Sequence, residues 1–72
     1  MQLSPLEKFI APLGGQEIEL QQVDHAAGGM SLLRIRIREQ SRFTVFDIDP
    51  ITAGNWGKAM QRWAQTQDAG TG

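Results

Sequence analysis

The sequence lacks several residue types that small proteins use for disulfide bonds, metal binding and catalysis. It contains no cysteine, no tyrosine and only one histidine. Without cysteine there can be no disulfide, thiolate metal site or cysteine nucleophile. The serines stand in no nucleophile-elbow context. We therefore expect a protein that is not an enzyme and that carries no cofactor.

Long hydrophobic runs are also missing. No uninterrupted apolar stretch approaches the ~20 residues that a membrane-spanning helix requires. The N-terminus has no charged segment followed by an apolar one, so no signal peptide is expected. Together with the absence of cysteine, this predicts a cytoplasmic protein that does not associate with membranes.

The chain is short and nearly neutral. Its 72 residues carry a net charge of −1, and chains of this length bury only about 60% of their unfolded surface, so the core must be thin. We expect a single domain over residues 1–66, and a disordered tail over residues 67–72 because that segment has nothing to bury. The net charge argues against a nucleic-acid binder, whose domains are usually basic.

Hydrophobic spacing predicts a helix at each end of the chain. Ser4 and Pro5 suit the start of a short helix over residues 1–13, where apolar residues recur at helical spacing. Asp49 and Pro50 suit the start of a second helix that ends near Gln65. The apolar positions of the first helix would be Leu6, Ile10 and Leu13, and those of the second would be Trp56, Met60 and Trp63.

Alternating apolar and polar residues predict three strands between these helices, over residues 16–24, 30–38 and 42–48. Short connections make neighbouring strands antiparallel. Folding each hairpin about its turn centre places Ile35 opposite Ile18 and Val45. The sequence therefore predicts an α+β fold, in which a three-stranded antiparallel β-meander is preceded by a short helix and followed by a second helix packed on one face (α-β-β-β-α).

The predicted outer face of this sheet is the first candidate site. It combines arginines with apolar side chains, as the centres of protein interfaces do, and its predicted contact residues are Leu32, Arg34, Arg36, Arg38, Phe46 and Ile48. Arg42 would lie beside them across the turn. The alternative is a solvated face on which Glu17 and Glu19 neutralise the arginines. A third interpretation is weak binding of single-stranded nucleic acid.

A polar cluster is the second candidate. The register brings Asp24 and His25 to the same end of the sheet as Asp47 and Asp49, where they could form an oxygen–nitrogen metal site or an acid–base pair. The alternative is that Asp49 caps the helix and that the others are ordinary residues beside turns.

Our preferred prediction is a small non-enzymatic protein–protein interaction or accessory module, with a homodimer as one form. Its partner would be another protein or a second copy, rather than nucleic acid. Gly54 and Gly57 inside the second helix each cost about 1 kcal/mol relative to alanine. We expect this helix to pack closely against the sheet at these glycines. The alternative is a loosened first turn, with the regular helix beginning near Asn55.

Overall fold

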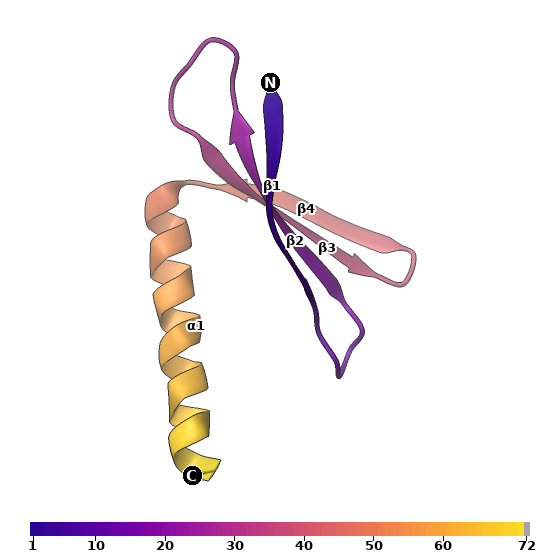
Figure 1. Cartoon of the computed structure of the whole chain (residues 1–72), viewed down its shortest axis with the longest axis vertical. Coiled ribbons are helices and arrows are strands. Elements are labelled where there is room, and N and C mark those ends of the chain that lie inside the picture. The colour runs from indigo at the N-terminus through magenta and orange to yellow at the C-terminus, as the bar shows by residue number, and fades with distance from the viewer. Residues whose placement is uncertain (72) are drawn as a thin grey trace.

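A computed structural model describes the backbone of residues 1–71 and the side chains of residues 1–67. It is an α+β fold with four strands and one helix (Figure 1). The elements are β1 (Gln2–Ile10), β2 (Glu17–Asp24), β3 (Leu32–Glu39), β4 (Arg42–Ile48) and α1 (Pro50–Thr71). The strands form one antiparallel meander in the order β1-β2-β3-β4. The predicted meander is confirmed, but it has a fourth strand.

The predicted N-terminal helix is wrong, because its residues form the edge strand β1. Pro5 has no N–H to give to a ladder, so within a sheet it is tolerated at an edge or a bulge. Both conditions hold here, since β1 pairs only with β2 and its register shifts between Pro5 and Glu7. Pairing with β2 gives β1 backbone hydrogen bonds along one edge over nine residues, whereas Pro12 would cut a helix short.

The hairpin turns set the register. Gly15 has a φ of 70° and its N–H donates to the carbonyl of Ala11 (2.7 Å), which closes the β1–β2 connection. A two-residue loop of Gln40 and Ser41 joins β3 to β4, and Gln40 has a φ of 55°. Such short loops require a positive φ and fix the strand pairing.

The two predicted hairpin registers fail in different ways. Ile18 pairs with Ile37 rather than Ile35, a two-residue shift that keeps every side chain on its predicted face. Ile35 pairs with Phe46 rather than Val45, a one-residue shift that turns β4 over. Phe46 and Ile48 therefore lie on the opposite face from Arg34, and the predicted grouping of these side chains on one face is wrong. Arg42 leaves the arginine row in the same way, because it pairs with Glu39.

The start of α1 follows the prediction. Asp49 accepts a hydrogen bond from the backbone N–H of Thr52 (3.1 Å), and Pro50 is the first helical residue. The helix continues to Thr71 rather than ending near Gln65. Gly72, the last residue of the predicted disordered tail 67–72, lies outside the described residues. Within the described chain, no helix has the length and apolar character needed to cross a bilayer.

The helix departs from the sheet instead of lying across it (Figure 1). A Cβ atom added at Gly54 or Gly57 would meet nothing within 4 Å, so the predicted close packing of the two glycines against the sheet is wrong. Among the described residues, Val23 and Ile35 are the only buried hydrophobic side chains, and they lie on opposite faces of the sheet. The radius of gyration is 14.6 Å, whereas a compact chain of this length has about 11 Å.

Candidate interaction surfaces

The sheet has two faces of different chemistry. We call the face that carries the central arginines the arginine face, and its side chains are Leu3, Lys8, Ile10, Glu17, Glu19, Gln21, Val23, Leu32, Arg34, Arg36, Arg38, Phe43, Val45 and Asp47. We call the other the helix-side face, and its apolar side chains are Phe9, Ile18, Leu20, Leu33, Ile35, Ile37, Phe46 and Ile48. Strand alternation alone separates the two sets.

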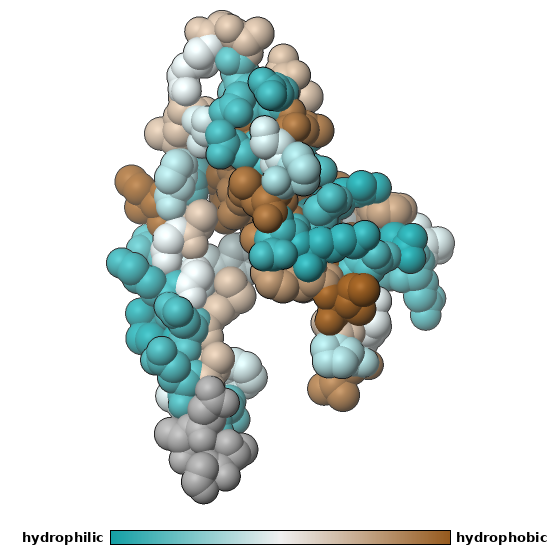
Figure 2. Space-filling model, viewed as in Figure 1, coloured by the Kyte–Doolittle hydropathy of each residue, from teal (hydrophilic) through white to brown (hydrophobic). Residues whose placement is uncertain are grey.

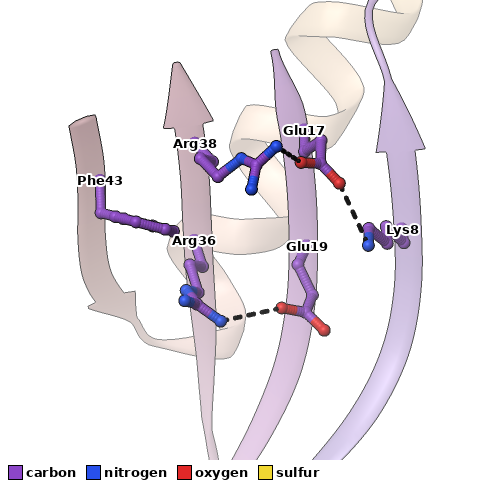
Figure 3. Close-up of a pocket in the computed structure, with 6 residues that line it drawn as sticks. All are labelled: Lys8, Glu17, Glu19, Arg36, Arg38 and Phe43. Atoms are coloured by element: carbon purple, nitrogen blue, oxygen red, sulfur yellow. Dashed lines mark ion pairs between the residues drawn. The ribbon is translucent and has the colours of Figure 1, made fainter. Parts of the chain in front are cut away.

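Glu17 lies between two cations on the arginine face (Figure 3). One carboxylate oxygen is 3.2 Å from Lys8 Nζ on β1, and the other is 2.8 Å from an Arg38 guanidinium nitrogen on β3. The hydrogen bond to Lys8, reinforced by the charge of Arg38, lowers the pKa of Glu17. One carboxylate thus links three strands.

Arg36 is engaged from both sides. Its guanidinium Nη1 lies 3.6 Å from an oxygen of Glu19 on β2. Its Cζ also lies 4.7 Å from the centroid of the Phe43 ring on β4, within the ~6 Å range of cation–π attraction. Figure 3 shows these side chains on the side of the sheet that faces away from α1.

Arg34 forms a two-pronged pair with Asp47 on β4. Arg34 Nε donates to Asp47 Oδ1 at 2.8 Å, and Nη2 donates to Oδ2 at 3.1 Å. These hydrogen bonds lower the pKa of Asp47. The one-residue shift of β4 explains why Asp47 lies beside Arg34, because the predicted register would have directed its carboxylate toward the core.

Each arginine of the row Arg34, Arg36 and Arg38 therefore already has a carboxylate partner. Two of these pairs, Arg36–Glu19 and Arg38–Glu17, line a depression of about 140 Å³. Exposed pairs of this kind contribute about 0–1 kcal/mol each. Their main consequence is to leave little unpaired positive charge for a polyanion.

The predicted polar cluster does not form a single site. Asp24 accepts hydrogen bonds from the Ser31 hydroxyl and from Gln22, and these lower the pKa of Asp24. Asp47 is held by Arg34, and Asp49 caps α1, where hydrogen bonds from Thr52 lower its pKa. Among the described residues, no three His, Asp or Glu side chains are grouped so that they could hold a metal ion.

The helix-side face is apolar and poorly covered. Phe46 contacts Trp56 of α1, with ring centroids 6.0 Å apart. Beyond that contact, the apolar stripe of α1 becomes more exposed along the helix, from 40% at Trp56 to 53% at Met60 and 66% at Trp63. We call these three residues the helix stripe. The predicted stripe exists, but the sheet of the same chain does not cover it.

A groove of about 310 Å³ opens where α1 leaves the sheet, and Leu6, Leu33 and Ala53 are among its lining residues. Figure 2 shows the helix and the sheet hairpins extending as separate arms, with open space between them. Sequence reasoning missed this surface because it assumed that the helix would fold back.

Comparison with known proteins places the chain in a family. The model of a family of unknown function (DUF6967) matches residues 1–66. The chain belongs to this family. The match spans the whole sheet and most of α1, so the sheet and the helix stripe both lie within the DUF6967 region. No curated protein and no solved structure matches the chain.

Proposed function

We propose that this DUF6967 chain is a small non-enzymatic protein–protein interaction module. The observation that supports it best is the imbalance between exposed and buried apolar side chains. Among the residues whose side chains the structure describes, fourteen large hydrophobic residues are exposed and two hydrophobic residues are buried. Exposed apolar patches of this kind mark interaction sites in soluble proteins.

The proposed contact surface combines the helix stripe with the helix-side face. Tryptophan is enriched among the residues that dominate binding energy, and Trp56 and Trp63 flank Met60 on one side of α1. Of the predicted contact residues, Phe46 and Ile48 belong to this surface. Leu32 and the arginines Arg34, Arg36 and Arg38 lie on the arginine face, where they remain a secondary candidate.

Two other functions have less support. Binding of single-stranded nucleic acid would use the arginine face, but the ion pairs with Glu17, Glu19 and Asp47 compete with phosphate for the same guanidinium groups. An acid–base or metal site would use Asp24, His25, Asp47 and Asp49, but three of these carboxylates have separate structural partners.

Photo-crosslinking in the native cell tests the proposal. A benzophenone amino acid at Met60 should produce crosslinked protein adducts. The same group at Ile51 is the matched control, since Ile51 is exposed but lies on the opposite side of α1. Adducts from position 60 and few from position 51 would support an interaction module. Equal or absent adducts from both positions would contradict it.

A further inference from the structure

The surface area of the chain indicates how much of it a partner must cover. A folded monomer of 8.0 kDa exposes about 4,450 Å². This chain exposes 5712 Å², which exceeds that expectation by roughly 1,250 Å². Two such chains would together have an excess of roughly 2,500 Å², within the range of 2,000–5,000 Å² that obligate dimers bury.

From this excess we infer that the occupant of the exposed apolar surface is a second copy of the chain. This inference rests on the proposed function and specifies its partner. In the proposed dimer, the helix stripe of each copy packs on the helix-side face of the other copy. The two helices are thus exchanged across a two-fold axis, and each fills the space that Figure 2 shows beside the sheet.

The chain offers both halves of such an interface. The helix stripe is a ridge of large side chains at positions i, i+4 and i+7, and the helix-side face is an apolar sheet surface with Phe9 and Phe46 partly exposed. An isologous contact uses the same two patches on each copy. One two-fold contact therefore covers the helix stripe and the helix-side face of both copies. An unrelated protein would have to supply one surface that fits the stripe and another that fits the helix-side face.

Charge complementarity favours the same arrangement. Residues 1–49 contain five Lys or Arg and seven Asp or Glu, which gives a net charge of −2. The helix α1 contains Lys58, Arg62 and Asp68, which gives +1. The helix of one copy and the sheet of another therefore carry opposite net charges, which favours their encounter.

The first experiment measures the mass of the purified full chain by size exclusion with light scattering. A dimer is expected, and its melting temperature should rise with protein concentration, because association stabilises the folded state by mass action. A chain that stays monomeric across the concentration range, with a constant melting temperature, would overturn the inference. These measurements use the unaltered protein, so they do not depend on how a variant folds.

A pair of variants then locates the interface. Trp63→Glu places a charge in the helix stripe and should weaken the dimer by about 30-fold or more, as expected for a central interface tryptophan. Gln65→Glu adds the same charge on the opposite side of α1 and should leave the dimer intact. Equal effects of the two substitutions would overturn the proposed use of the stripe.

Crosslinking tests the helix exchange itself. The chain has no cysteine, so introduced thiols are the only ones present. Thr44→Cys on the helix-side face and Ala59→Cys beside the stripe are made in separate chains and then mixed. A short bismaleimide should crosslink the mixture of the two variants more efficiently than it crosslinks either variant by itself. A mixture with Gln65→Cys in place of Ala59→Cys should give little of this product. A dimer without this mixed product would overturn the exchanged arrangement.

The two proposals can fail separately. A monomeric chain whose position 60 crosslinks to a different protein in cells would retain the interaction module but remove the second copy as its partner. A chain that is monomeric and forms no adducts at position 60 would remove both.

Discussion

Phe46 on β4 and Trp56 on α1 lie with ring centroids 6.0 Å apart and planes tilted by 30°. This pair joins the helix to the sheet, since α1 otherwise extends away from it. Aromatic pairs contribute about 0.5–1.5 kcal/mol beyond their burial. A double-mutant cycle with Phe46→Ala and Trp56→Ala should give a coupling of that size by denaturant unfolding. Additive losses would contradict the pairing.

The cap of α1 provides a second prediction. Asp49→Ala removes the acceptor for the Thr52 N–H and should lower the melting temperature by about 4–8 °C in a domain of this size. Asp49→Asn keeps a capping oxygen and is the matched control, with a smaller decrease expected. Thermal unfolding followed by circular dichroism measures both. An unchanged melting temperature for Asp49→Ala would show that the cap is dispensable.

Acid should destabilise the protein. The pKa values of Glu17, Asp24, Asp47 and Asp49 are all lowered in the folded chain from ordinary values of 4.5 for Glu and 3.8 for Asp. A lowered pKa contributes stability that is present above the ordinary value and is lost as the pH falls through the folded-state pKa. The melting temperature should therefore decrease on acidification below about pH 4.5.

Glu17 allows this acid effect to be assigned. Glu17→Gln removes the carboxylate that bridges Lys8 and Arg38. The variant should therefore lose less stability between pH 5 and pH 3 than the unaltered chain. The difference should roughly equal the stability that one carboxylate with a lowered pKa contributes. Glu7→Gln is the same substitution on β1 and is the control. Identical acid profiles for Glu17→Gln and the unaltered chain would remove Glu17 from the explanation.

Gly54 is a site where alanine should stabilise. It lies in α1 with open space around its missing side chain, and it is on the opposite side of the helix from the helix stripe. Gly54→Ala should raise the free energy of unfolding by about 0.5–1 kcal/mol, because alanine loses less backbone entropy in a helix. Chemical denaturation measures this. A destabilised variant would indicate that something packs against this side of α1.

The register of β4 shows where sequence reasoning reached its limit. The apolar alternation of the segment 42–48 predicted a strand, and the strand is there. Its facing depended on whether the turn was centred on Gln40 or between Gln40 and Ser41. Shifting the turn centre by half a residue changes the pairing by one residue, which moves every side chain of the strand to the other face. As a result, Phe46 contacts Trp56 and Asp47 pairs with Arg34. Strand alternation alone could not predict either contact.

The N-terminal segment shows a second limit. Ser4, Pro5 and the spacing of Leu6, Ile10 and Leu13 fit a short helix locally. The choice between helix and strand depended on β2, whose free edge offers hydrogen bonds along the length of β1. Here pairing with a neighbouring strand overrides the local preference for a helix.

The sequence by itself determined the α+β class, the antiparallel meander and the capped start of the C-terminal helix. Those features depend on residues close in sequence or on strand periodicity. Only the tertiary structure decided the fourth strand, the facing of β4 and the departure of α1 from the sheet. They depend on edge pairing, on turn geometry and on how little of the helix stripe one chain can cover.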